Sequence, residues 1–122
     1  MIRNRDNAPH YCWGDGCDGW RLHEDDHVGV IEELVPVGGS ERPHHHTHCG
    51  QVFIVLDGAA VMRLPDGDRH LRRGDSLAIA PGVVHQFRND GAAPVRFLVI
   101  TSPRRRWDRV DATPSSPVFP GV

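Results

Sequence analysis

The chain has 122 residues, a formal net charge of −2 and a sequence pI near 6.5. This length supports one hydrophobic core, so a functional site must lie inside that core or at its rim. The near-neutral charge gives no general attraction to phosphate backbones or anionic membranes, which predicts a small-molecule partner, no nucleic acid and no membrane. All 14 basic residues are arginines, which excludes lysine Schiff bases, Walker-type phosphate lysines and lysine nucleophiles.

The 3 cysteines, Cys12, Cys17 and Cys49, are an odd number. The sequence shows no signal peptide and no apolar run approaching the roughly 18 residues of a membrane span. These features predict a reduced, cytoplasmic protein. The C-x4-C spacing of Cys12 and Cys17 is poor for a zinc knuckle, because no second cysteine pair accompanies it.

Three regions follow one another along the chain. Residues 1–27 include YCWGDGCDGW, whose glycines and tryptophans predict a turn-rich lead-in segment packing on the core domain. Residues 28–103 contain short runs rich in Val, Ile, Leu and Phe between turn residues, and none sustains a helical period. They predict an all-β core barrel. Residues 104–122 end in DATPSSPVFPGV, which predicts a C-terminal arm or linker, compatible with a longer fused protein.

Two turn signals indicate how the strands connect. Asp66-Gly67 and Asn89-Asp90-Gly91 each lie between strand candidates, so each is predicted to form a hairpin turn. Hairpins at this spacing favour a barrel or jelly roll.

The segment RPHHHTHCGQVFIVLDG carries the densest group of potential metal ligands. Alternate side chains of a strand share a face, so His44 and His46 should point one way and His45 the other. Gln51 breaks this alternation, and a bulge or a corner at Gly50 is predicted to turn its amide back toward an ion. His85, which follows a Pro-Gly turn, is predicted to face the cluster and complete a three-nitrogen, one-oxygen site.

Other residues are assigned from the same alternation. Phe53 and Val55 lie on the same strand face as Gln51, and Phe87 lies on the same face as His85. These three apolar residues are therefore predicted to line a substrate pocket, with His48 near its mouth. One of Glu32 and Glu33 must face inward, where a carboxylate is a candidate general base, and the alternative is a rim residue paired with arginine. His45 and His70 are expected to face solvent.

Over residues 28–103 the chain resembles the cupin superfamily. The first cupin motif, G-x5-H-x-H-x3/4-E-x6-G, is similar to the run from Gly38 to Gly58, with glutamine replacing glutamate. The second, G-x5-P-x-G-x2-H-x3-N, is similar to the run from Gly74 to Asn89, with Ala80 at the usual proline. The resemblance implies a small bacterial single-domain cupin, a double-stranded β-helix or jelly-roll barrel, and the ligands His44, His46, Gln51 and His85.

The expected activity follows from this ligand set. A neutral glutamine leaves a divalent ion at a formal +2, which favours Lewis-acid chemistry on a carboxylate, enolate or phenolate. Zinc is favoured, and iron(II), nickel and manganese also suit mixed nitrogen and oxygen ligands. The prediction is therefore a biosynthetic lyase, isomerase or cyclase, since some similar zinc cupins are polyketide cyclases.

Three alternatives stay open at this point. Some cupin dioxygenases use iron(II) on a neutral three-histidine set. Similar small cupins are joined to synthetase-like domains in hydrazine synthetases, where they form an N–N bond from an amino-acid ester. A cupin can also bind a small ligand without turnover. The resemblance further implies a homodimer, formed by an edge strand or by the N-terminal segment.

Overall fold

The computed structural model describes residues 1–112. These residues form strands and no helix, as the alternating apolar pattern predicts, and they contain no helix able to cross a membrane. The strands are β1 (His10–Trp13), β2 (Cys17–Glu24), β3 (Gly29–Val35), β4 (His44–His46), β5 (Gly50–Asp57), β6 (Ala59–Leu64), β7 (Gly67–Arg72), β8 (Ser76–Ile79), β9 (Gln86–Arg88), β10 (Val95–Ser102) and β11 (Arg109–Asp111).

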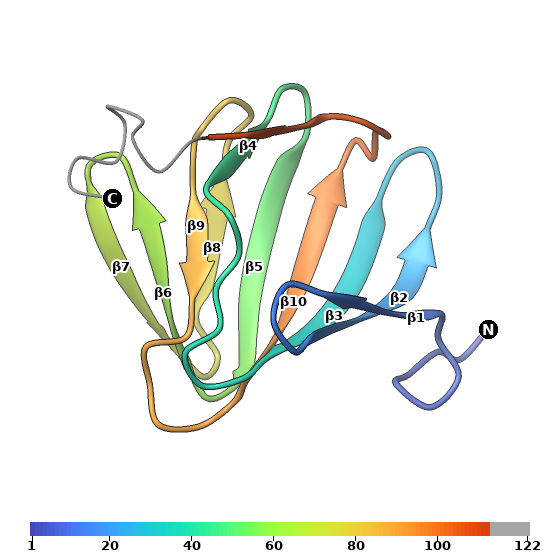
Figure 1. The fold of residues 1–122 in the computed structure, drawn as a ribbon. Coiled ribbons are helices and arrows are strands. Elements are labelled where there is room, and N and C mark those ends of the chain that lie inside the picture. Colours follow the sequence, from blue (N-terminus) through green and yellow to red (C-terminus); the bar gives the residue numbers. More distant parts are fainter. Residues whose placement is uncertain (113–122) are drawn as a thin grey trace.

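The strands form two layers that face each other (Figure 1). One layer is a six-stranded sheet in the order β1-β2-β3-β10-β5-β8. The other contains β7-β6-β9 and the pair β11-β4, joined by the isolated bridges Ser40↔Arg88 and His44↔His85. The lead-in segment therefore contributes β1 and β2 to the larger sheet, beside β3. This arrangement is the predicted jelly roll.

The core fills the space between the layers. Alternate residues of β5 and β10 are buried, as a strand with one covered face requires. Phe53, Phe87 and Phe97 are each at most 2% exposed, and the rings of Phe87 and Phe97 stack with centroids 3.9 Å apart. Burying three aromatic side chains supplies a large share of the apolar area that stabilises so small a domain.

The two predicted hairpin turns have different outcomes. β6 and β7 do pair as a hairpin, but its turn is Pro65-Asp66, and Gly67 is already the first residue of β7. The prediction for Asn89–Gly91 is wrong, because β9 pairs with β6 while β10 pairs with β3 and β5. This loop crosses between the layers, held by buried Asn89, whose Nδ2 donates to the carbonyls of Val35 (3.1 Å) and Ala93 (2.9 Å).

Two motif glycines provide a matched test of the turns. Gly58 and Gly74 have nearly equal backbone angles, with φ of 84° and 87°. A Cβ at Gly58 would lie 2.6 Å from the Pro94 carbonyl oxygen, whereas one at Gly74 would meet nothing within 4 Å. We expect Gly58→Ala to lower the free energy of unfolding by about 1–3 kcal/mol more than Gly74→Ala. Denaturant titration of both variants measures the difference, and equal losses would contradict the turn geometry.

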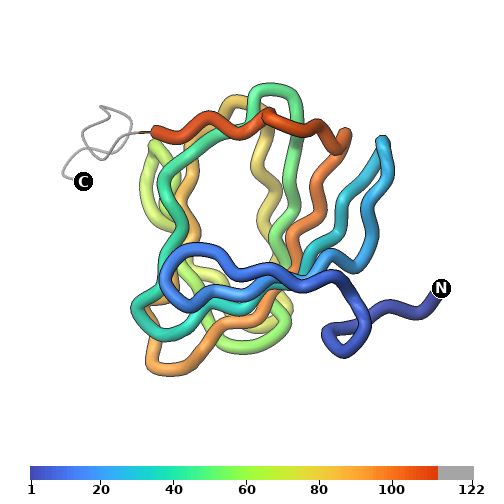
Figure 2. Tube along the Cα trace, turned by 45° about the vertical axis from the view of Figure 1, so that its right-hand side comes forward, coloured from blue at the N-terminus to red at the C-terminus, as the bar shows by residue number. Residues whose placement is uncertain are grey.

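The C-terminal arm returns to the histidine segment. β11 pairs antiparallel with β4, and the backbone of residues 104–112 runs from the end of β10 across one end of the two layers (Figure 2). The rest of the predicted arm, residues 113–122, lies outside the described residues. The segment that carries two of the predicted metal ligands therefore lies between β11 and His85.

Candidate metal centre

Three histidines from two segments meet between the layers. His44, His46 and His85 each offer a ring nitrogen, and these atoms lie within 4.8 Å of one another. His44 and His85 are held directly opposite by reciprocal backbone hydrogen bonds of 3.0 and 2.9 Å. Neighbouring His45 pairs with Val110 of β11 and is absent from the cluster. The strand alternation therefore brings together the three histidines that the sequence singled out.

Backbone carbonyls fix which ring nitrogen can bind an ion. His44 Nδ1 lies 2.8 Å from the Arg42 carbonyl oxygen, and His85 Nδ1 lies 2.9 Å from that of Val83. A carbonyl oxygen only accepts, so both Nδ1 atoms carry the hydrogen and both Nε2 atoms keep a lone pair. The Nε2 of His85 is buried with no hydrogen-bond partner among the described residues. Such carbonyl contacts are the usual way that proteins orient metal-binding imidazoles.

The electrostatic environment keeps these imidazoles neutral. Burial, reinforced mainly by the neighbouring His85, lowers the pKa of His44 to about 3. Burial likewise lowers the pKa of His85 to about 4, and it lowers the pKa of His46. A histidine must be deprotonated to bind a metal ion, so all three are in the required state at neutral pH.

Gln51 faces the interior from the opposite layer. β4 and β5 belong to different layers, so residues 47–49 form a corner that resets the alternation. Of the two predicted alternatives at Gly50, a bulge or a corner, the structure has the corner, and Gln51 stands in regular register opposite Thr101 and Ile79. Its Nε2 donates to Thr101 Oγ1 at 3.1 Å, while its Oε1 is buried without a partner among the described residues.

These buried atoms fit a divalent cation. Unpartnered buried polar atoms are rare and costly, and within residues 1–112 both His85 Nε2 and Gln51 Oε1 lack a hydrogen bond. Imidazole nitrogens with an amide oxygen suit zinc, iron, nickel and manganese alike. His44, His46, His85 and Gln51 are thus the residues that would hold the ion.

The structure separates the two glutamates of β3. Glu33 stands opposite buried Phe97 on the inner face, where its Oε1 accepts a hydrogen bond of 3.0 Å from the Tyr11 hydroxyl. Glu32 points to the outer face and pairs with Arg5 at 3.2 Å and with Arg96 at 3.7 Å. Glu33 is therefore the inward carboxylate, and Glu32 is the one paired with arginine.

Tyr11 reaches Glu33 across an intervening strand. The two residues flank Gly19 in register, and a Cβ at Gly19 would lie 2.2 Å from the Tyr11 ring. The sequence reasoning missed Tyr11, although a glycine inside a strand signals a close approach of this kind.

A second buried carboxylate, Glu41, was also missed. Its Oε1 accepts a hydrogen bond of 2.9 Å from the Phe87 backbone N–H, and its Oε2 lies 4.0 Å from His44 Nδ1. Burial raises the pKa of Glu41 to about 8. Because Glu41 precedes β4 in an irregular segment, no strand alternation could have assigned its direction.

The ionisation of Glu33 gives a prediction with a definite sign. Burial raises the pKa of Glu33 to about 7, against the Tyr11 hydrogen bond, which lowers it. An unfolded chain ionises this group near pH 4.5, so stability is lost as pH rises from there to about 7. The free energy of unfolding of metal-free Glu33→Gln, measured relative to the wild type, should therefore rise by up to about 1.4 kcal/mol for each pH unit in this window. Denaturant titrations across these pH values check the slope, and a constant difference would contradict it.

The residues predicted to line the pocket lie mainly below the histidines. Phe53, Val55 and Phe87 are at most 2% exposed, and the Phe53 ring centroid lies 5.8 Å from that of His85. All three belong to the hydrophobic core, and the Phe53 ring brings that core into contact with His85. The His48 side chain is exposed, and its backbone N–H donates to the Asp108 carboxylate at 3.0 Å.

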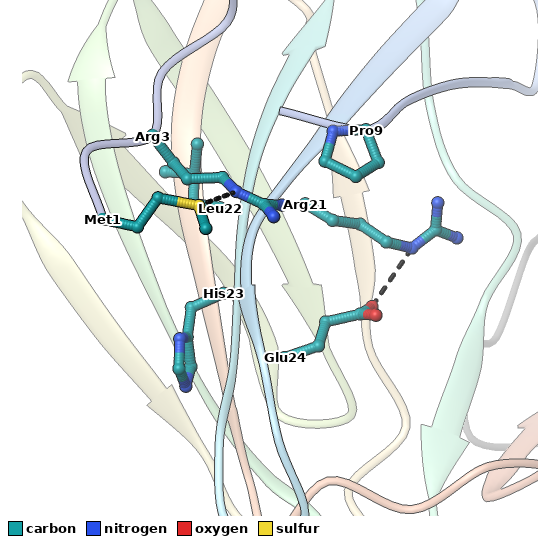
Figure 3. Close-up of a pocket in the computed structure, with 7 residues that line it drawn as sticks. All are labelled: Met1, Arg3, Pro9, Arg21, Leu22, His23 and Glu24. Atoms are coloured by element: carbon teal, nitrogen blue, oxygen red, sulfur yellow. Dashed lines mark hydrogen bonds and ion pairs between the residues drawn. The ribbon is translucent and has the colours of Figure 1, made fainter. Parts of the chain in front are cut away.

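Other groups lie apart from this centre. Cys17 is buried in the core while Cys12 is exposed beside His10 and Asp18, so the two cysteines do not share a site. A surface hollow of about 500 Å³ contains none of the three clustered histidines (Figure 3). It is lined by Met1, Arg3, Pro9, Arg21, Leu22, His23 and Glu24.

Known proteins resemble this chain in sequence and in fold. It is 29% identical over 86 residues to an uncharacterised protein of Methanocaldococcus jannaschii, covering 67% of this chain and 69% of that one. It is 29% identical over 85 residues to the tetracenomycin polyketide synthase protein TcmJ of Streptomyces glaucescens, covering 67% of this chain and 56% of TcmJ.

Among solved structures, the polyketide cyclase RemF of Streptomyces resistomycificus superposes with a TM-score of 0.78 at 23% identity, covering 97% of this chain and 90% of RemF. A sugar phosphate isomerase of Silicibacter pomeroyi superposes with a TM-score of 0.76 at 24% identity, covering 86% of this chain and 76% of the isomerase. The family model described as a cupin domain matches residues 30–101. This match spans more than half of the chain and includes all three histidines and Gln51, so the protein belongs to the cupin family.

Proposed function

We propose that this cupin is a metal-dependent enzyme that moves a proton on a small oxygenated metabolite, in a lyase, isomerase or cyclase reaction. The observation that carries the proposal is the group of His44, His46 and His85, whose ring nitrogens lie within 4.8 Å of one another and whose imidazoles are held neutral. His85 Nε2 and, in the facing layer, Gln51 Oε1 are two of the buried side-chain atoms that lack a hydrogen-bond partner in the described part of the chain. A divalent ion bound there would supply Lewis acidity toward a substrate oxygen.

Glu33 is the proposed general acid or base. Its pKa of about 7 allows it to hold or accept a proton near neutral pH, which is the condition for efficient proton transfer. The Tyr11 hydroxyl fixes the Glu33 carboxylate by donating to Oε1. Glu33 shares the inner face of the larger sheet with Gln51, because Glu33 pairs with Phe97 and Phe97 pairs with Val55, which lies on the same face of β5 as Gln51.

Deuterium exchange tests the proposal with a panel of small oxo acids and β-keto phenols. Protein purified without nickel resin is assayed for metal content, emptied, reloaded separately with Zn²⁺, Mn²⁺, Ni²⁺ or Fe²⁺, and incubated with each compound in D₂O. We expect one ion per chain and deuterium incorporation next to a carbonyl carbon. Glu33→Gln should keep the ion and lose the exchange, whereas Glu32→Gln should keep both.

Two outcomes would overturn the proposal. A chain that takes up no ion would remove its basis, and exchange unaffected by Glu33→Gln would remove the assigned acid or base. Substrate-dependent oxygen uptake that requires Fe²⁺ would instead assign the centre to a dioxygenase.

A further inference from the structure

Arg109 faces the metal centre from the edge strand β11. It stands directly opposite His46 in the antiparallel pair β11-β4, and Asp111 stands opposite His44. Residues directly opposite in such a pair project from the same face, with Cβ atoms about 5 Å apart. Arg109 therefore projects on the face of this strand pair that carries His44 and His46. The strand β11 runs across one end of the two layers (Figures 1 and 2).

The backbone around Arg109 is held on both sides. The Asp108 carboxylate accepts hydrogen bonds of 3.0 Å from the backbone N–H groups of His48 and Cys49, and Asp108 is 6% exposed. The Ala112 N–H donates to the Pro43 carbonyl at 2.8 Å. These contacts tie β11 to the segment that carries His44 and His46, so the guanidinium is presented by a fixed strand.

The Arg109 guanidinium has N–H groups that can donate hydrogen bonds to a ligand. Arg109 Nε donates to Asp111 Oδ1 at 2.8 Å, and within residues 1–112 no hydrogen bond is found for its Nη atoms. The Arg109 side chain is 45% exposed, so these donors are accessible to a ligand from solution. A planar guanidinium matches the two oxygens of a carboxylate better than any other side chain does.

A bound metal ion and the Arg109 guanidinium are both positively charged, so an anion between them would relieve their repulsion. With four neutral ligands, a bound divalent ion would keep its formal +2, and Arg109 stands directly opposite the ligand His46. Like charges placed close together destabilise the site unless an opposite charge lies between them. Asp111 offsets only part of this, because its side chain is 49% exposed and its charge is screened by solvent.

We propose that Arg109 binds a carboxylate of the substrate, so that the natural substrate is a small organic acid held between the metal centre and β11. This inference rests on the proposed function and narrows it, since it makes a carboxylate a required substrate group. Arg109 is thereby a positioning and specificity residue beside the metal centre.

Carboxylate titration of the Co²⁺-loaded protein tests this assignment, with the visible Co²⁺ spectrum as the readout. Acetate and malonate are the probes, and acetamide is the uncharged control. We expect Arg109→Gln to weaken malonate binding about 10- to 100-fold, the range of a charge-assisted pair, and Arg109→Lys to weaken it less. Arg106→Gln removes an exposed charge from the same segment and should change nothing. Co²⁺ affinity itself should be equal or tighter in Arg109→Gln, because a repelling charge is removed.

The outcomes separate this inference from the proposed function. If Arg109→Gln binds both carboxylates like the wild type, or if it loses Co²⁺ affinity together with stability, the carboxylate-binding role is overturned and Arg109 is structural. If the wild type takes up no Co²⁺, the proposed function fails, and calorimetric titration of malonate into the metal-free protein tests the role of Arg109 separately. Malonate binding that depends on Arg109 in this titration supports the role, and no such binding overturns it.

Discussion

His85→Leu is expected to bind Zn²⁺ at least about a hundredfold more weakly than the wild type, while changing metal-free stability by no more than about 1 kcal/mol. The first expectation follows because Nε2 of His85 is the buried lone pair that an ion would take. The second follows because leucine removes both a stabilising bond to Val83 and an unpartnered polar atom, and these effects offset each other.

Stability measured with and without metal checks both parts. At free Zn²⁺ of about a hundred times the wild-type Kd, binding stabilises the wild type by about 2.7 kcal/mol, and a variant that binds about a hundredfold more weakly gains only about 0.4 kcal/mol. His45→Leu is the matched control, because His45 lies in the same strand as His44 and His46 but outside the cluster, and it should keep the full gain. A large loss of metal-free stability in His85→Leu would instead show that His85 is a structural residue.

Gln51→Glu is expected to tighten Zn²⁺ binding and to weaken carboxylate binding, each by about 10- to 100-fold. The substitution keeps an oxygen donor at the position of Oε1 and adds one negative charge. The added charge attracts the cation and repels an anion that would bind beside it. Calorimetric titrations of Zn²⁺, and then of malonate into the loaded protein, measure the two affinities.

Gln51→Ala serves as the comparison, because it removes the oxygen without adding charge. It should weaken Zn²⁺ binding, so that the alanine and glutamate variants move the metal affinity in opposite directions. A Gln51→Glu protein that kept its metal and changed neither the activity nor the anion affinity would show that the neutral amide has no special role.

The strand pattern and part of the site could be predicted from local sequence. Side chains alternate along a strand, so the sequence was enough to place His44 and His46 on one face and Phe53 and Val55 on a buried one. The Asn89 loop shows where this reasoning fails. A turn signal marks a change of direction, but it does not state whether the next strand stays in the same layer.

The parts that required tertiary structure depend on which face of each strand is covered. Alternation required one of Glu32 and Glu33 to point inward, but only the structure, in which Glu33 stands opposite buried Phe97, selected Glu33. Gln51 faces the interior from the layer opposite β4 because residues 47–49 form a corner. The sequence left a bulge or a corner open at Gly50, and only the assignment of β4 and β5 to different layers decided between them.

Residues brought in from distant segments were beyond the sequence altogether. Tyr11 reaches Glu33 only because β1, β2 and β3 are aligned in register over Gly19, and Arg109 faces the centre only because β11 pairs with β4. The sequence by itself thus determined the strands, the histidine set and the family resemblance, which depend on local alternation and on motif spacing. Strand pairing between segments far apart in the chain decided which acid faces inward and which arginine stands opposite the histidines, because register is set by packing and hydrogen bonds across the sheet.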